Sequence, residues 1–183
     1  MMKKVILTIG PRGAGKSTLC QEVLARRSDV ALIERDAILR ELFGATMLSP
    51  YQGEHAYAAQ VLFERVGILL QRENAILILD MWNGFAQERV MIAKLLRGLG
   101  ADEIEGWHFV TSEDLVVRQF LAREQPTKLS RRAVEEGCRR DYRLFHRQHV
   151  ELSQGFDAIT VIDPAQLALF SWADILLPPR PHN

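Results

Sequence analysis

The sequence predicts an α/β fold in which a mostly parallel sheet of about five strands is covered by helices on both faces. Short apolar runs rich in β-branched residues alternate with longer segments whose apolar residues recur at helical spacing. The chain has 183 residues, of which 48% are hydrophobic, and this is enough for one sizeable core. We therefore expect a single domain over residues 1–183.

Five apolar runs are the expected strands, and the segments between them are the expected helices. The strands cover residues 4–9, 30–33, 75–79, 104–110 and 158–162. One helix is expected to start near Lys16, and another is expected to end near Phe43. Apolar residues at helical spacing indicate helices over 58–69 and 92–99. Ser112 is the expected N-cap of a helix through Leu121, and a long polar helix is expected over 131–152.

The charge of the chain is balanced overall but not locally. Lysine plus arginine and aspartate plus glutamate both count 23, so a strongly basic nucleic-acid surface is absent from the chain as a whole. Residues 118–147 nevertheless hold nine of the lysines and arginines against four acids. This local excess favours a partner that is anionic but compact.

Cysteine content and hydropathy are typical of a cytoplasmic protein. The two cysteines do not make a disulfide framework. The apolar run before Gly10 is too short for a signal sequence, and no later run reaches the ~18 apolar residues that a membrane span needs. We therefore expect a cytoplasmic protein with no membrane partner.

The stretch GPRGAGKS, residues 10–17, satisfies the pattern G-x-x-x-x-G-K-[ST] between an expected strand and an expected helix. Glycines let backbone N–H groups curl around an anion, and the helix N-terminus points at the same place. The pattern predicts a nucleoside triphosphate with Mg²⁺, in which Lys16 reaches the β- and γ-phosphates and Ser17 binds the metal. The expected nucleotide-binding residues here are Gly10, Arg12, Gly13, Ala14, Gly15, Lys16, Ser17 and Thr18.

Asp36 follows the second expected strand, at the edge where an α/β sheet binds ligands. A kinase that acts on a hydroxyl needs a carboxylate there to orient the nucleophile and take its proton, so Asp36 is the candidate catalytic base. Arg40 lies one helical turn further on and faces the same acceptor site. The alternative is that Asp36 is only the N-cap of the helix that follows.

Asp80 ends the third expected strand and so reaches the same edge. We expect it to contact the metal, together with Ser17, or the acceptor, and Asn83 lies close enough to contribute to the acceptor site. The alternative is that Asp80 caps the next helix.

The segment DLVVRQFLAREQPTKLSRR suggests a small helical lid over about residues 123–132. An arginine that such a lid brings in can stabilise the charge that develops during phosphoryl transfer. Arg123 is the candidate for this catalytic role, and Arg118 for the nucleotide site. The alternative is that these arginines form a solvated helix face.

GPRGAGKST, ERDAILRELFG and ILILDMWNGFAQER together resemble the P-loop kinases related to polynucleotide 5′-hydroxyl kinase, over about residues 4–162. The resemblance implies a P-loop NTPase fold with the P-loop strand central in a five-stranded parallel sheet, and ATP as the donor. It also implies that Asp36 is the general base and that Arg40 contacts an acceptor phosphate. The family spaces these two as D-x-x-R, whereas this chain reads D-A-I-L-R.

Taken together, the motifs predict an ATP- and Mg²⁺-dependent kinase that phosphorylates a hydroxyl group. The resemblance favours a 5′-hydroxyl of a nucleic acid or nucleotide. The neutral net charge fits a small-molecule acceptor equally well, such as a sugar, a nucleoside or an antibiotic. A nucleotide-binding switch that is not a kinase is a further alternative, although the sequence holds no guanine-reading N-K-x-D stretch.

Overall fold

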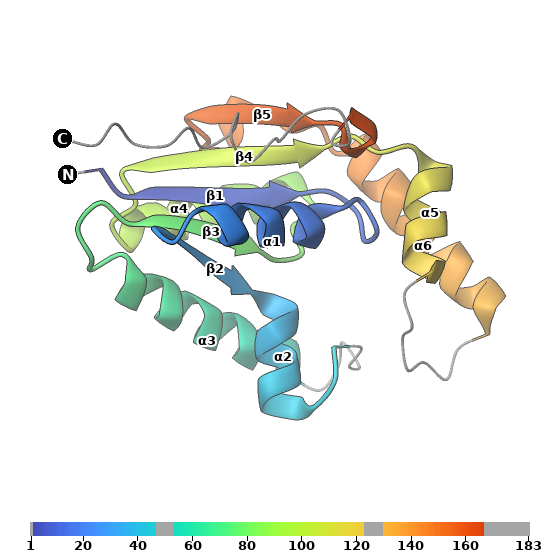
Figure 1. Ribbon diagram of the computed structural model, residues 1–183, viewed down its shortest axis with the longest axis horizontal. Coiled ribbons are helices and arrows are strands. Elements are labelled where there is room, and N and C mark those ends of the chain that lie inside the picture. The colour runs from blue at the N-terminus through green and yellow to red at the C-terminus, as the bar shows by residue number, and fades with distance from the viewer. Residues whose placement is uncertain (1, 47–52, 123–129, 167–183) are drawn as a thin grey trace.

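The computed structural model describes residues 2–46, 53–122 and 130–166, so Arg123 and most of the expected lid lie outside the described residues (Figure 1). The strands are β1 (Lys4–Ile9), β2 (Val30–Glu34), β3 (Ile76–Asp80), β4 (Glu103–Phe109) and β5 (Ala158–Ile162). The helices are α1 (Lys16–Arg26), α2 (Arg35–Phe43), α3 (Glu54–Leu69), α4 (Ala86–Gly98), α5 (Glu113–Ala122) and α6 (Arg131–Arg147), with 3₁₀ turns at Leu152–Gln154 and Pro164–Gln166.

The five strands form one parallel sheet in the order β2-β3-β1-β4-β5, with β1 in the centre. Alternate residues of β1 pack into two different cores. Val5 and Leu7 pack with the apolar residues of α3 and α4, whereas Ile6 packs with those of α1. Burial on both faces explains why this strand reads as an unbroken apolar run, and it confirms the predicted fold class.

α5 and α6 lie side by side beyond the carboxyl ends of the strands (Figure 1). α6 begins at Arg131, where the Ser130 side chain accepts a hydrogen bond from the amide of Ala133. The sequence predicted that this helix would continue to residue 152, but it ends at Arg147.

A buried arginine explains the early end of α6. Arg89, in α4, is fully buried, and all its N–H bearing atoms donate hydrogen bonds. Two of the acceptors are the carbonyl oxygens of Gln148 and His149, at 3.1 and 2.8 Å from Nη2, so these carbonyls are drawn toward Arg89 rather than along the helix axis. The other acceptors are the carbonyls of Asn83 and Gly84 and the Gln154 side chain.

The carboxyl ends of β1, β2 and β3 meet at one edge of the sheet, where the P-loop, Glu34 and Asp80 lie. Glu34 stands opposite Asp80 in the strand register. The sequence motifs therefore converge on one place. Across the described ranges, no helix combines the length and apolar character needed to cross a membrane.

Candidate functional site

The P-loop connects β1 to α1 and leaves the N-terminus of α1 open to an anion. Gly15 is the N-cap, with a left-handed φ of 89°, and no side chain in the described ranges caps the helix. The first turn of α1 contains no acidic residue. Because the first amides of a helix have no partner within it, and its dipole is positive there, this end suits a phosphate group.

Gly13 shows why the loop needs a glycine. Its φ is +82°, and a Cβ built there would lie 2.4 Å from the carbonyl oxygen of Val116 and 3.2 Å from the Cβ of Phe120, both in α5. A side chain at this position therefore cannot fit without moving the P-loop or α5. The phosphate-binding loop is packed directly against the helix that precedes the expected lid.

Two cations of the P-loop have defined partners. Lys16 Nζ donates hydrogen bonds to the carbonyl oxygens of Gly10 and Pro11, at 2.9 and 3.1 Å, so the ammonium group lies back over the loop. The Arg12 guanidinium pairs with Asp141 of α6, with Nη2 2.6 Å from Oδ2. It also lies 5.7 Å from the centre of the Phe120 ring. Arg12 therefore ties the P-loop to both α5 and α6.

Ser17 and Asp80, the two predicted metal ligands, lie together. Ser17 Oγ donates a hydrogen bond to Asp80 Oδ2 at 3.2 Å, and Thr8 Oγ1 donates one to Asp80 Oδ1 at 2.6 Å. Mg²⁺ prefers oxygen ligands and often takes only one or two from the protein, so this pair fits it. In the part of the chain that the structure describes, no cluster of three or more His, Cys, Asp or Glu side chains suits a metal ion.

The structure does not support the capping alternatives for the two aspartates. α4 begins at Ala86, with Phe85 as its N-cap, so Asp80 lies too far back to cap it. α2 begins at Arg35, with Glu34 as its N-cap, so Asp36 lies inside the first turn. Asp36 is exposed, and it lies two residues beyond Glu34, which stands opposite Asp80 in the strand register.

Glu34 is a carboxylate that the sequence analysis missed. Burial raises its pKa, and the negative charges of Asp80 and Asp36 raise it further, while Arg40 opposes them. The pKa of Glu34 therefore depends on the charges of both candidate aspartates. Its position as the last residue of a strand was the signal that could have identified it.

Arg35 is a second residue that the sequence analysis missed. Arg40, the expected acceptor ligand, is exposed, whereas Arg35 is half-buried between Asp36, Arg12 and Glu88. Burial lowers the pKa of Arg35. Its Nη2 lies 3.0 Å from His55 Nδ1, and its Nε is buried without a hydrogen-bond partner among the residues that the structure describes. The sequence signal that could have identified Arg35 was its position directly before the candidate base, at the end of a strand.

The acceptor role of Asn83 stays a prediction, and the structure gives its side chain a structural role. It is fully buried, and its Nδ2 donates hydrogen bonds to the carbonyl oxygens of Thr8 and Met81, at 2.7 and 3.1 Å. The side chain therefore fastens the loop after β3 to β1. This burial does not favour the acceptor contact that the sequence suggested.

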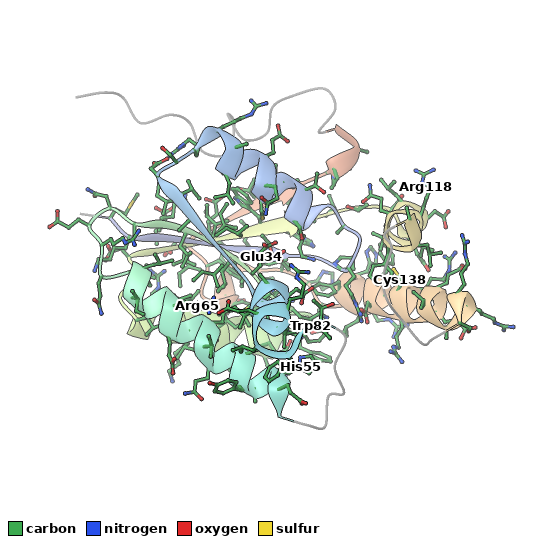
Figure 2. All side chains as sticks on the ribbon, turned by 60° about the horizontal axis from the view of Figure 1, so that its bottom comes forward. Glu34, His55, Arg65, Trp82, Arg118 and Cys138 are labelled. Atoms are coloured by element: carbon green, nitrogen blue, oxygen red, sulfur yellow. The ribbon has the colours of Figure 1, made fainter. Side chains whose placement is uncertain are left out.

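The structure does not bring Arg118 to the nucleotide site. Arg118 is exposed, and it lies two residues from Val116 and Phe120, whose backbone and side chains meet the P-loop. Helical geometry turns it to the opposite side of α5, as Figure 2 shows. Arg123, the other lid arginine, lies outside the described residues.

A family profile described as "AAA domain" (AAA_33) matches residues 5–144 of the chain. The chain belongs to this AAA domain family. The match begins in the P-loop strand and runs into α6, so it includes every candidate residue discussed above. No curated protein matches the sequence.

Solved structures with the same fold include kinases with different acceptors. A chain of the Pnkp1/Rnl/Hen1 RNA repair complex matches 81% of this chain with 19% identity and a TM-score of 0.66, and this chain spans only 47% of it. A fungal RNA kinase matches 100% of this chain and 92% of its own, at 14% identity and a TM-score of 0.59. Shikimate kinase from Acinetobacter baumannii, in complex with shikimate, matches 96% and 91% of the two chains, at 16% identity and a TM-score of 0.57. These likenesses, all below 20% identity, show that this chain shares its fold with kinases of different acceptors.

Proposed function

We propose that this AAA domain protein is an ATP- and Mg²⁺-dependent kinase that transfers the γ-phosphoryl group of ATP to a hydroxyl group. The observation that carries the proposal is the arrangement of three elements at one sheet edge. These are the open N-terminus of α1, the Ser17–Asp80 pair beside it, and the exposed Asp36 in the first turn of α2, just after β2 ends. A phosphate site, a metal site and a base in this order suit in-line phosphoryl transfer.

Each residue has a role in this reaction. The backbone amides of the P-loop and Lys16 hold the phosphates of ATP. The acceptor oxygen forms a bond to the γ-phosphorus while the bond to the ADP oxygen breaks, and the hydroxyl proton passes to Asp36. Arg123 remains the candidate for stabilising the equatorial charge, and Arg118 is a weaker one because of its outward position.

Ser17 and Asp80 would hold Mg²⁺, which supplies charge neutralisation at the phosphate oxygens when it is bound. In the structure the Ser17 hydroxyl and Thr8 keep the Asp80 carboxylate in place. Both oxygens of Asp80 are therefore oriented before the metal arrives.

A nucleic-acid or nucleotide 5′-hydroxyl is the acceptor that we favour. The RNA repair chain and the RNA kinase that share the fold support it, and so does the excess of positive charge in residues 118–147. The second candidate is a small molecule, which the shared fold with shikimate kinase and the neutral net charge support.

The experiment that tests the proposal is ATP consumption in the presence of Mg²⁺, measured with a panel of acceptors. The panel holds a 5′-hydroxyl oligonucleotide, nucleosides, sugars and aminoglycoside-like antibiotics. Transfer to the oligonucleotide supports the favoured acceptor, and transfer only to a small molecule supports the second. ATP binding with no transfer to any acceptor would contradict the kinase proposal and favour a nucleotide-binding switch.

The variant Asp36→Asn tests the role of the base. We expect transfer to fall by about 10²- to 10⁴-fold, since the carboxylate that accepts the proton is lost. ATP affinity is expected to stay nearly the same, because the expected ligands of the phosphates are the P-loop amides and Lys16 rather than Asp36. Unchanged transfer in this variant would contradict the mechanism.

A further inference from the structure

A groove of about 610 Å³ lies between the loop after β3 and one face of α6. Phe85 forms one wall. The other wall consists of residues of α6 that recur at helical spacing, including Arg140, Arg143, Leu144 and Arg147. A volume of this size suits a ligand of a few hundred daltons.

The groove is positively charged. Arg140 and Arg147 are exposed and have no ion pair in the described ranges, and Arg143 has only a distant one, with Nη2 3.7 Å from Glu113. The one acid in the lining, Asp141, is already paired with Arg12 of the P-loop. The groove therefore attracts an anion whose charges are spaced along the helix.

The opposite wall is aromatic. Phe85 is 41% exposed, and its ring meets the ring of Trp82 edge to face, with the centres 5.6 Å apart. Trp82 packs in turn against Phe145 of α6, with the ring centres 6.0 Å apart. Figure 2 shows Trp82 near the end of α6 that is closest to the sheet. An exposed ring that is supported from behind suits the flat face of a base.

The groove also adjoins the candidate active site. Phe85 lies five residues beyond Asp80, in the loop that leaves the metal site. On the other side, the ion pair of Arg12 with Asp141 joins α6 to the P-loop. The loop after β3 therefore runs from Asp80, at the candidate metal site, to Phe85 in the wall of the groove.

We propose that the groove binds a nucleotide unit of a single-stranded nucleic-acid acceptor, downstream of the end that carries the hydroxyl. Arg140 and Arg147 contact its phosphates, and Phe85 stacks on its base. The proposal rests on the kinase function proposed above, since it specifies the acceptor of that site. A free nucleotide has the same chemistry, and the experiment separates the two sources.

The first test is binding of a 5′-hydroxyl single-stranded DNA octamer with a 3′ fluorescein, followed by anisotropy without ATP. We expect Arg140→Gln/Arg147→Gln to weaken binding about tenfold or more at low salt. The slope of the affinity against salt should fall by roughly one to two, since two phosphate contacts are lost. Arg72→Gln/Lys94→Gln is the matched control, because it removes the same charge from exposed positions outside the groove, and it should bind like the wild type.

Phe85→Leu tests the aromatic wall. It keeps an apolar side chain and removes the ring, so we expect a loss of about fivefold or more in affinity with an unchanged salt slope.

Adenosine monophosphate tests whether the groove binds a nucleic-acid strand or a free nucleotide. It should fail to displace the octamer at concentrations near the octamer Kd. If it binds as tightly as the octamer, and more weakly in the double arginine variant, the groove takes a free nucleotide and the strand proposal is wrong.

Phosphoryl transfer distinguishes failure of this proposal from failure of the kinase function. For the octamer, the double arginine variant should raise KM and leave kcat unchanged. If the wild type phosphorylates the octamer while the double variant has the affinity and KM of the control, the groove proposal is overturned and the kinase stands. If the octamer binds through the groove and neither it nor any other acceptor of the panel is phosphorylated, the kinase proposal fails, and the groove binds nucleic acid without being an acceptor site.

Discussion

Glu34 gives the acidic edge of the site a measurable pH signature. Its pKa is raised in the folded protein, chiefly by burial and then by the charge of Asp80, above the ordinary value of 4.5. The folded state therefore binds a proton more tightly than the unfolded state, and the ionised side chain costs stability above the folded pKa.

We expect Glu34→Gln to be more stable than the wild type at about pH 8 without Mg²⁺, with a difference that shrinks toward about pH 5. Urea denaturation across this pH range measures it. Glu41→Gln is a control of opposite sign, because the hydrogen bond from Arg65 lowers the pKa of Glu41. A wild type that is the more stable protein at high pH would contradict this account of Glu34.

Arg35 and Arg40 can be compared directly as acceptor ligands. Arg35 has a buried Nε that no described residue hydrogen-bonds, whereas Arg40 is exposed. A charge-assisted hydrogen bond is worth about 1.5–3 kcal/mol, so we expect Arg35→Gln to raise the KM of a phosphate-bearing acceptor by about tenfold or more. Arg40→Gln should have a smaller effect. The reverse order in steady-state kinetics would return the role to Arg40.

At the scale of elements, the P-loop packs against α5 so closely that a Cβ at Gly13 would lie 2.4 Å from the Val116 carbonyl oxygen. We expect Gly13→Ala to lower stability by about 1–3 kcal/mol and to weaken ATP binding, because the residue is held at a positive φ against the α5 backbone. Thermal unfolding and ATP titration measure the two effects.

Gly137→Ala is the control for this substitution. Gly137 lies inside α6, and a Cβ there meets no atom of the described residues within 4 Å. This variant should gain about 0.5–1 kcal/mol, since alanine is the better helix former. Equal effects of the two substitutions would show that the contact with α5 is unimportant.

The sequence predicts the elements well where the signal is local. β1 and β5 have the predicted bounds, and β2, β3 and β4 differ by one residue at their ends. The early end of α6 was not predictable, because its cause is Arg89, which is 59 residues away from Gln148 along the chain. Neither was the burial of Asn83, whose amide reaches a carbonyl 75 residues away.

The site shows the same division between local and distant causes. The juxtaposition of Ser17 and Asp80 follows from the P-loop pattern and from strand ends that share one edge. By contrast, Arg12 reads as a nucleotide ligand in the sequence, and only the folded chain shows that it pairs with Asp141. Pattern identifies the residue types at the edge, and packing between distant segments decides which of them face the ligand.

At the scale of the whole molecule, Arg89 connects segments that are far apart in the sequence. We expect Arg89→Met to cost about 3 kcal/mol or more, because buried carbonyl groups lose their donors. The free energy of unfolding in urea is the measurement. Arg72→Met, at an exposed position, should change it by less than about 0.5 kcal/mol. A similar small change for Arg89→Met would contradict this structural role.

The Arg89 guanidinium also holds the two walls of the α6 groove together. It binds the carbonyls of Asn83 and Gly84, just before Phe85, and those of Gln148 and His149, just after α6. The walls are thus preorganised, and a ligand does not have to order them. Calorimetry of octamer binding should accordingly show a small entropic penalty in the wild type. A substitution that loosens Arg89 should increase this penalty, even though every residue that lines the groove is unchanged.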